Sequence, residues 1–440
     1  MMFLPAYIHT CIRMLEEAGF AAYAVGGCVR DALLGLQPHD YDLATSARPD
    51  EIRRVFSSFR LILAGEKHGT VTVMMDGEQV EITTFRREGD YADSRHPLWV
   101  DFVPEIEEDL ARRDFTVNAM AYSPIRGFAD PFGGREDLKK RILRAVGDPN
   151  RRFTEDALRI LRGVRFAVRY RLQVEETTGL AMEALADRME VLSRERVFEE
   201  LCKLLPLVSC EDLLRFAPIM IQVIPELAPL QGFDQKNRHH IYDIYTHTAY
   251  VVEKVPGDLT LRWAALLHDI GKPASFTLDS EGEGHFYGHA AISADMADTV
   301  LHRLKAPTAL RERVVLLIGK HMLWLEVRKP AIRRWISRLG MEAMKQLMIL
   351  QEADTGSKGT ENPRENPYFS GVAALMAEIA EEDACLSLKD LAVNGHDLMA
   401  LGFSGKQVGQ MLNRLLELVM EEELPNEKVP LLTRVQEELL

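Results

Sequence analysis

The chain has 440 residues, of which 47% are hydrophobic and 27% are charged, and its formal net charge is −14 at pH 7. This composition is that of an ordinary soluble globular protein, and the length exceeds what one hydrophobic core usually supports, so we expect several domains. The sequence has no apolar stretch long enough to cross a membrane, and its N-terminus lacks the basic and cleavable regions of a signal peptide. We therefore expect a cytoplasmic protein without a membrane partner.

The cysteine pattern and the distribution of charge limit which kinds of protein are expected. The five cysteines are scattered and contain no C-x-x-C pair, which argues against a disulfide framework and against a thiolate zinc site. A negative net charge is unusual for a protein that binds nucleic acid, but arginine and lysine are concentrated in residues 135–171. A second, looser basic stretch at residues 303–338 is interpreted as a solvated helical face.

In chain order, the first 85 residues predict a small mixed sheet with flanking helices. Helices are expected at residues 6–19 and 49–56, and strands at residues 21–25, 40–44, 61–63, 70–75 and 79–85. A polar segment without periodicity follows at residues 86–97, and such segments inside a domain are usually functional or disordered. From about residue 153 the periodicity is almost entirely helical, with a loop expected at residues 277–285.

The first chemical motif combines a glycine pair with carboxylates. Gly27 would let the backbone approach a triphosphate, and Arg30 adds a guanidinium fork for phosphate oxygens. Asp40 and Asp42 would share one face of a strand and offer Mg²⁺ two hard oxygen ligands, with Glu81 as a plausible third acid. Each piece alone also fits a turn or a solvated surface, but together they predict metal-assisted nucleotidyl transfer.

A second motif places one acid and three arginines three residues apart on an expected helix, as Asp156, Arg159, Arg162 and Arg165. This spacing makes a slowly winding charged stripe, which an exposed ion-paired helix would also explain. Cytosine and adenine each present an amino donor beside a ring-nitrogen acceptor. A carboxylate paired with an arginine would therefore accept these two bases and refuse uracil and guanine.

A third set of residues mixes histidine with aspartate, which is a good combination for a divalent metal. Its core is the adjacent pair His268 and Asp269 in the run His-Asp-Ile-Gly-Lys, preceded by His247. His289 and His321 follow along the chain, and Asp354 could complete the ligand shell. The pattern resembles an HD phosphohydrolase domain, which implies a bound divalent metal and leaves hydrolytic activity open.

Four motifs, occurring in the order shown, closely resemble the class II tRNA nucleotidyltransferases and bacterial poly(A) polymerases of the polymerase β-like superfamily. They are Gly26-Gly27-Cys28-Val29-Arg30-Asp31, Asp40-Tyr41-Asp42, residues 112–119 and residues 155–162. The resemblance extends over nearly the whole chain. It implies a nucleotide site made of Gly27, Arg30, Arg113, Asp114, Asn118, Asp156, Arg159, Arg162 and Arg165, in which Asp156 and Arg159 template the base.

The resemblance also implies roles for two other segments. Residues 86–97 correspond to a loop needed to add the terminal adenosine, and residues 391–398 are similar to a segment that approaches the acceptor arm of tRNA. Arg113, Asp114 and Asn118 would surround the ribose, although an ion pair and a helix cap would explain them structurally. The run Ser193-Arg194-Glu195-Arg196 is interpreted as a brace between helices.

The predicted fold is α+β. A mixed-sheet nucleotidyltransferase head at residues 1–145 precedes an all-helical neck at 146–205, a body with the HD domain at 206–380 and a tRNA-binding tail at 381–440. The expected activity is template-independent addition of CCA to tRNA from CTP and ATP with Mg²⁺ at Asp40 and Asp42. An enzyme that adds only A, or an HD phosphohydrolase acting on RNA ends, remains possible at this point, whereas the acidic C-terminal end disfavours a poly(A) polymerase. The sequence leaves the oligomeric state open.

Overall fold

The computed structural model describes residues 2–89, 99–237, 241–359, 366–382 and 384–438. Its internal contacts divide the chain into two compact units. The first comprises Met1–Leu207 with Arg215–Pro225, and the second comprises Val208–Leu214 with Glu226–Leu440. The finer division into head, neck, body and tail stays a prediction.

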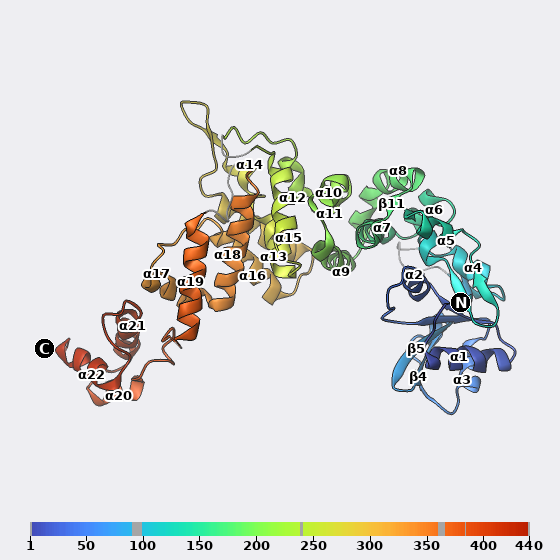
Figure 1. Cartoon of the computed structure of the whole chain (residues 1–440), viewed down its shortest axis with the longest axis horizontal. Helices are drawn as coiled ribbons and strands as arrows, with labels where there is room; N and C mark the ends of the chain where they lie inside the picture. Colours follow the sequence, from blue (N-terminus) through green and yellow to red (C-terminus); the bar gives the residue numbers. More distant parts are fainter. Residues whose placement is uncertain (1, 90–98, 238–240, 360–365, 383, 439–440) are drawn as a thin grey trace. The chain divides into compact units, whose positions relative to one another are not determined.

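A seven-stranded mixed sheet forms the base of the first unit, in the order β3-β4-β5-β2-β1-β8-β9. Adjacent strands in this sheet are antiparallel except for β2 and β5, which are parallel. The helices α1 (Ala6–Glu17) and α3 (Pro49–Val55) lie together beside the sheet (Figure 1). The strands are β1 (Ala22–Val25), β2 (Asp42–Thr45), β3 (Arg60–Ile62), β4 (Thr70–Met75), β5 (Glu78–Thr84), β8 (Ala121–Ser123) and β9 (Gly127–Ala129).

Periodicity explains how these elements pack. Helix α1 buries Ile8, Cys11, Ile12 and Leu15, whose spacing places them on one face. Strand β4 alternates between half-buried and buried residues, as expected for a strand with one face toward the core. These elements confirm the mixed sheet that the sequence predicted.

Strand β2 begins at Asp42, so the prediction of a strand over residues 40–44 was wrong at its start. Its partner β1 ends at Val25, because Gly26 has a φ of 73° and turns the chain into α2 (Gly27–Leu33). The register pairs Ala24 with Leu43, which leaves no residue of β1 to pair with Asp40. Asp40 therefore lies in the loop before the strand and does not share a strand face with Asp42.

The polar segment after β5 contains regular structure that the sequence did not predict. Strand β6 (Arg86–Glu88) pairs antiparallel with β7 (Val100–Phe102), with Arg86 opposite Phe102. The rest of the predicted loop, residues 90–97, lies outside the described residues. This pair of strands forms because the two ends of the segment lie side by side, and local periodicity cannot show such a pairing.

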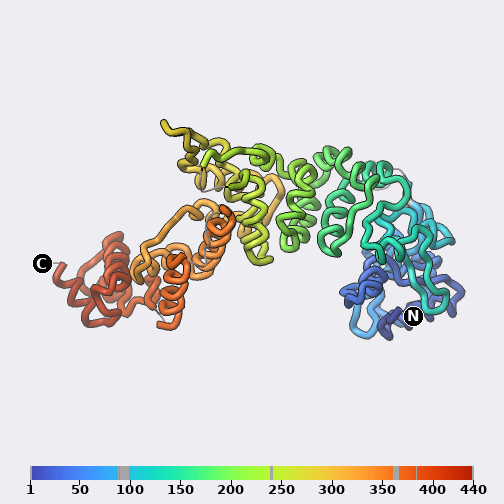
Figure 2. The backbone as a smooth tube through the Cα atoms, turned by 45° about the horizontal axis from the view of Figure 1, so that its top comes forward, coloured from blue at the N-terminus to red at the C-terminus, as the bar shows by residue number. Residues whose placement is uncertain are grey.

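The other α-helices of the first unit lie between residues 106 and 223, a stretch that Figure 2 colours from cyan to green. They are α4 (Ile106–Ala111), α5 (Gly134–Lys139), α6 (Pro149–Glu155), α7 (Leu158–Tyr170), α8 (Glu176–Ala184), α9 (Arg194–Leu204) and α11 (Ala217–Val223). The short strand β10 (Ile142–Leu143) pairs in parallel with β11 (Gln173–Val174), so the predicted neck is not entirely helical.

The single helix predicted through Asp156 and Arg165 is broken at its start. Helix α6 ends at Glu155, Asp156 is extended with φ −145° and ψ 103°, and α7 begins at Leu158. The Asp156 carboxylate accepts a hydrogen bond of 3.0 Å from the Leu158 backbone N–H, a donor that the start of α7 would otherwise leave unpaired. The charged stripe on α7 therefore contains Arg159, Arg162 and Arg165, with Asp156 outside the helix.

Among its described residues, the second unit is helical apart from a two-stranded hairpin, β12 (Thr277–Leu278) and β13 (Gly284–His285), in the segment predicted as a loop. Its helices are α10 (Cys210–Arg215), α12 (Ile244–Lys254), α13 (Leu259–Leu267), α14 (Lys272–Ser275), α15 (His289–Arg303), α16 (Thr308–Lys320), α17 (Lys329–Leu339), α18 (Met341–Gly356), α19 (Pro367–Glu381), α20 (Gly395–Ala400), α21 (Lys406–Met420) and α22 (Lys428–Glu437). The last three share a small apolar core that includes Leu398, Leu415 and Leu431. Among the described helices, none has the length and apolar character of a membrane span.

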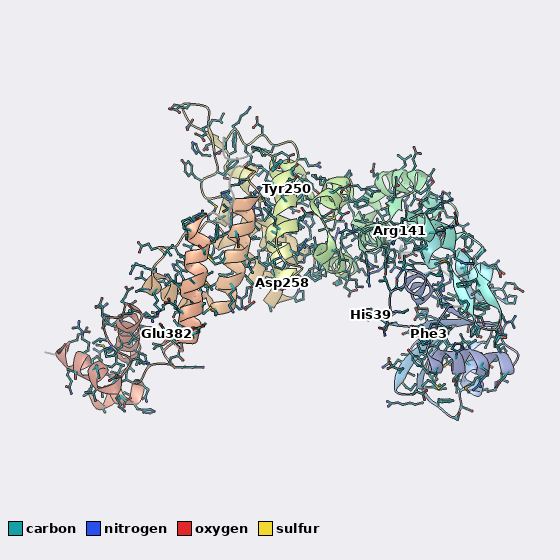
Figure 3. All side chains as sticks on the ribbon, viewed as in Figure 1. Phe3, His39, Arg141, Tyr250, Asp258 and Glu382 are labelled. Carbon is teal, nitrogen blue, oxygen red and sulfur yellow. The ribbon has the colours of Figure 1, made fainter. Side chains whose placement is uncertain are left out.

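The basic stretch at residues 303–338 is not simply a solvated face. In α17, Arg333 donates to Glu382 at 3.0 Å and to Glu422 at 2.8 Å, and its side chain is only 12% exposed. Glu382 is labelled in Figure 3, at the end of α19. Basic residues of α17 therefore pair with acids near the ends of α19 and α21, which lie far along the chain.

Candidate functional sites

A cavity of about 440 Å³ in the first unit contains most of the predicted nucleotide site. Its lining is strongly basic, with six arginines against three aspartates among the described residues, which suits an anionic ligand. The lining residues are Gly27, Arg30, Asp42, Arg112, Arg113, Asp114, Asn118, Asp156, Leu158, Arg159, Arg162, Phe166 and Arg196.

Asp42 lines this cavity, and a second acid lies beside it on the adjacent strand. Asp42 of β2 is in register with Glu81 of β5, so both side chains leave the same face of the sheet. Partial burial raises the pKa of Asp42, and the charges of Glu81 and Asp40 raise it further, while Arg113 lowers it. Carboxylates that repel one another in this way form an oxygen donor set that fits a hard divalent cation.

Arg30 is held by the protein beside the cavity. It is buried, its Nη2 donates to the Tyr170 hydroxyl at 2.6 Å, and its guanidinium lies 4.2 Å from the centre of the Tyr170 ring. Its Nη1 donates to the side-chain oxygen of Asn118. Arg30 thus connects α2 to α7 in addition to lining the cavity.

The hydrogen-bond chain continues from Asn118 to α7. The Asn118 amide donates to Asp114 Oδ1 at 3.0 Å, and Arg162 Nε donates to Asp114 Oδ2 at 2.9 Å. Burial raises the pKa of Asp114, but the charge of Arg162 and the bond from Asn118 outweigh it and hold that pKa at about 2. Asp114 therefore stays ionised and fixes two residues that line the cavity.

The Asp156 carboxylate is fixed from two sides. Besides the Leu158 N–H, it accepts a hydrogen bond of 2.9 Å from Arg196 on α9. A carboxylate has about four acceptor sites, so it can also accept from an amino group of a bound base. Sequence reasoning missed Arg196 at the cavity, because only the packing of α9 against α7 brings it to Asp156.

Arg159 is buried at the same wall. Its guanidinium donates to Glu155 Oε2 at 2.8 Å and to the backbone oxygens of Arg152 and Arg112, each at 3.1 Å. Arg159 is thereby oriented by the last turn of α6 and by the segment that carries Arg113. Both members of the predicted base-reading pair thus lie at one cavity, each with its position set by neighbouring residues.

Arg165 lies elsewhere. Its Nε donates to Glu200 Oε2 on α9 at 2.6 Å, and both side chains are buried. It does not appear among the described residues that line the cavity, and its role in nucleotide binding stays a prediction.

The second unit brings six metal-ligating side chains into one buried cluster. They form two groups of three whose ligand atoms lie within 4.8 Å of one another, namely His247, His268 and Asp354, and Asp269, His289 and His321. All six residues that the sequence suggested for this set thus lie together. A cavity of about 230 Å³ adjoins the cluster and is lined by Asp269, His289 and Lys272 among others.

Comparison with known proteins agrees with this arrangement. Family models match the poly A polymerase head domain at residues 22–144, the HD domain at 239–356 and tRNA nucleotidyltransferase domain 2 at 365–435. A further family model, described as a Probable RNA and SrmB-binding site of polymerase A, matches residues 171–230.

Curated relatives match nearly the whole chain. A CCA-adding enzyme of Levilactobacillus brevis is 36% identical over 430 residues, with 96% of both chains covered. Another of Streptococcus mutans is 32% identical over 447 residues, covering 99% of this chain and 98% of the relative. The crystal structure of the Bacillus stearothermophilus CCA-adding enzyme in complex with CTP superposes with a TM-score of 0.70 at 27% identity, covering 98% of each chain.

The fold and the cavity define a polymerase β-like nucleotidyltransferase that carries an HD domain. Because the relatives match along almost their entire length, the chain belongs to the family of class II CCA-adding enzymes.

Proposed function

We propose that this protein adds C, C and A in turn to the 3′ end of tRNA, using CTP and ATP without a nucleic-acid template. The observation that carries the proposal is one cavity that contains both the Asp42 carboxylate and the Asp156–Arg159 pair. Relatives named as CCA-adding enzymes cover 96% or more of the chain. They do not favour an enzyme that adds only A, or one that acts chiefly as a hydrolase of RNA ends.

Asp40, Asp42 and Glu81 would form the catalytic edge and hold Mg²⁺. Their oxygen donors fit this cation, and Asp42 lies beside Glu81 in register. When bound, Mg²⁺ lowers the pKa of the primer 3′ hydroxyl and neutralises the leaving pyrophosphate. The acids fix where the α-phosphate and the 3′ hydroxyl meet. Replacing Asp42 with Asn should lower transfer by about 10³-fold or more with CTP binding retained. Transfer within tenfold of the wild type would contradict this role.

The remaining cavity residues would bind the nucleotide. Gly27 leaves room for phosphate oxygens and Arg113 supplies charge beside Asp42. Arg30, Asp114, Asn118 and Arg162 form the connected chain that positions the ribose and triphosphate. Arg165 would act by fixing α7 through Glu200.

Asp156 would accept the amino group of cytosine or adenine, and Arg159 would donate to the ring nitrogen. Reversing donor and acceptor character, as in Asp156→Arg combined with Arg159→Asp, should shift preference toward UTP and GTP. Unchanged preference for CTP and ATP in a folded variant would refute this template. Swapping an exposed ion pair of the same unit, as in Asp50→Arg combined with Arg54→Asp, is the charge-matched control.

We further propose that the protein works in the cytoplasm, that its tail at residues 381–440 contacts tRNA, and that the HD domain binds a divalent metal. Relatives offer direct parallels for the substrates, since solved CCA-adding enzymes include complexes with CTP and with tRNA. Tail deletion should raise KM for tRNA and leave KM for CTP unchanged.

The decisive experiment uses purified protein with Mg²⁺ and two tRNA transcripts, one lacking CCA and one ending in CC, read at single-nucleotide resolution. The proposal expects three nucleotides on the first transcript and one on the second, after which addition stops. Extension of only the second transcript would identify an enzyme that adds A alone. Extension of neither would refute nucleotidyl transfer to tRNA.

A further inference from the structure

The sheet of the first unit presents an open face beside Asp42. The register pairs Asp42 with Glu81 across β2 and β5, so both side chains leave the sheet on the same side. That side continues over β4 and β3, because the residues of each strand alternate between the two faces. The open face is defined by Arg60 and Ile62 of β3, Thr72 and Met74 of β4, and Gln79 and Glu81 of β5.

The two faces of this part of the sheet differ in burial. Val71 and Val73 of β4 point to the opposite side and are 0% exposed, and α3 contacts β4 and β5. On the open face, Arg60 and Glu81 are exposed, and Ile62 is 37% exposed. An apolar side chain left in water between charged ones suits a ligand that has both apolar and charged parts.

The nucleotide cavity lies on the other side of Asp42. Strand β2 has β5 on one side and β1 on the other. Apart from Asp42, the described residues that line the cavity belong to α2 after β1, to residues 112–118 before β8, to residues 156–166 and to α9, and none belongs to β3, β4 or β5. The cavity and the open face therefore meet at Asp42 from opposite directions along the sheet.

The geometry of nucleotidyl transfer requires a second substrate on the β5 side. The attacking 3′ hydroxyl and the leaving pyrophosphate lie roughly in line, on opposite sides of the phosphorus atom. Gly27 and Arg30 would hold the triphosphate on the β1 side of Asp42, so the 3′ hydroxyl has to arrive from the β5 side. The open face is the surface that the RNA meets there.

We propose that the open face binds the last nucleotides of the RNA primer and positions its 3′ hydroxyl at Asp42 and Glu81. This assignment rests on the function proposed above and extends it, because it gives the primer a surface of its own. Strands β4 and β3 lie two and three strand spacings from β2, or about 10 and 14 Å. Met74 therefore packs against the terminal nucleotide, and Arg60 binds a phosphate upstream of it.

The residue types on the open face suit a primer whose end changes. Each addition changes the terminal base, so a surface that recognised base edges would reject some of the successive primers. Ile62 and Met74 offer apolar contact to any base or ribose, and Arg60 offers positive charge to any phosphate. Within the part of the chain that the structure describes, the Arg60 side chain has no ion pair or hydrogen bond, so its guanidinium is available to RNA.

Binding and kinetics of the full-length chain with a tRNA transcript lacking CCA test the Arg60 contact. Arg60→Gln should weaken tRNA binding about tenfold and leave KM for CTP within about twofold. The dependence of log affinity on log salt concentration should become shallower by about 0.7, the value for one phosphate contact of a single strand. Arg54→Gln makes the same charge change on α3, which packs on the opposite face, and should alter none of these values. An unchanged salt dependence in Arg60→Gln would refute the phosphate contact.

Substitutions of Met74 test the contact with the terminal nucleotide. Met74→Glu places a carboxylate in the path of the RNA and should lower kcat/KM for tRNA by about tenfold or more, whereas Met74→Leu should stay within about twofold of the wild type. KM for CTP should be the same in both variants, and thermal melting establishes that each is folded. Equal kcat/KM for tRNA in Met74→Glu and the wild type would contradict the proposal.

Photocrosslinking locates the primer directly. A tRNA transcript whose last nucleotide is 4-thiouridine, irradiated with the wild-type chain, should crosslink to peptides of β3, β4 or β5. Crosslinks confined to other segments would overturn the proposal, for example to residues 2–41, which supply most of the lining of a separate cavity of about 880 Å³ beside His39 and Tyr41. Extension of the transcripts is measured in parallel. If no tRNA is extended, the proposed function fails and this inference fails with it, whereas extension with crosslinks elsewhere refutes the open face alone.

Discussion

Replacing Asp114 with Asn should destabilise the first unit in a pH-dependent way. Asp114 is buried, and its pKa is about 2 because Arg162 and Asn118 favour the ionised form over the cost of burial. The ordinary pKa of an aspartate is 3.8, so the folded state stabilises the ionised form by about 2.5 kcal/mol more than the unfolded state does. Asn keeps the shape and the acceptor for the Phe115 N–H but removes the charge.

The sign of the pH dependence follows from the lowered pKa. The unfolded chain binds the proton more readily, so the contribution is complete above the unfolded pKa and is lost as pH falls toward 2. The difference between the wild type and Asp114→Asn should be about 2.5 kcal/mol at pH 7, nearly the same at pH 5, and about half as large at pH 3.

Hydrogen exchange of the α7 backbone amides, read by mass spectrometry, reports the first unit without requiring the whole chain to unfold in one step. Asp50→Asn is the matched control. Asp50 pairs with Arg54 on the surface, where such ion pairs contribute about 0–1 kcal/mol. A free-energy difference for Asp114→Asn that is the same at pH 7 and pH 3 would refute the assignment of this energy to the ionised carboxylate.

Three other substitutions probe the surroundings of the same cavity. Replacing Arg196 with Met should raise KM for CTP and ATP about tenfold at unchanged melting temperature, because one charge-assisted hydrogen bond to Asp156 is lost. Arg196→Lys should restore part of the affinity. An unchanged KM in Arg196→Met would show that Arg196 only holds the helices together. Glu200→Gln should destabilise the first unit by about 3 kcal/mol in the α7 exchange assay, since it leaves the buried Arg165 guanidinium without its carboxylate partner. A loss of stability below about 1 kcal/mol would contradict this. Gly26→Ala should raise KM for both nucleotides far more than Gly27→Ala. Gly26 has a φ of 73°, and a Cβ there would lie 2.5 Å from Arg113 Nη1, whereas a Cβ at Gly27 would lie 3.5 Å from its nearest atom. Equal steady-state KM values in the two variants would refute this reasoning.

The sequence by itself determined the class of protein. Gly27, Arg30 and the Asp40–Asp42 pair are close in sequence, and their spacing carries the nucleotidyltransferase motif whether or not the strand begins where periodicity suggests. The alternating runs at residues 70–75 and 79–85 predicted β4 and β5 within a residue, because each has one face in the core. The adjacent pair His268–Asp269 likewise identified the HD domain.

Only the tertiary structure decided which of these residues meet. Glu81 became the register partner of Asp42 through the pairing of β5 with β2, and Arg196 reached Asp156 through the packing of α9 on α7. The same packing paired Arg165 with Glu200, a partner that spacing along α7 could not show. The two oxygens of Asp269 face different histidine pairs for a similar reason. Spacing along one chain segment fixes local direction, whereas contacts between distant segments depend on how complete elements pack, and that packing determines the partner of each charge.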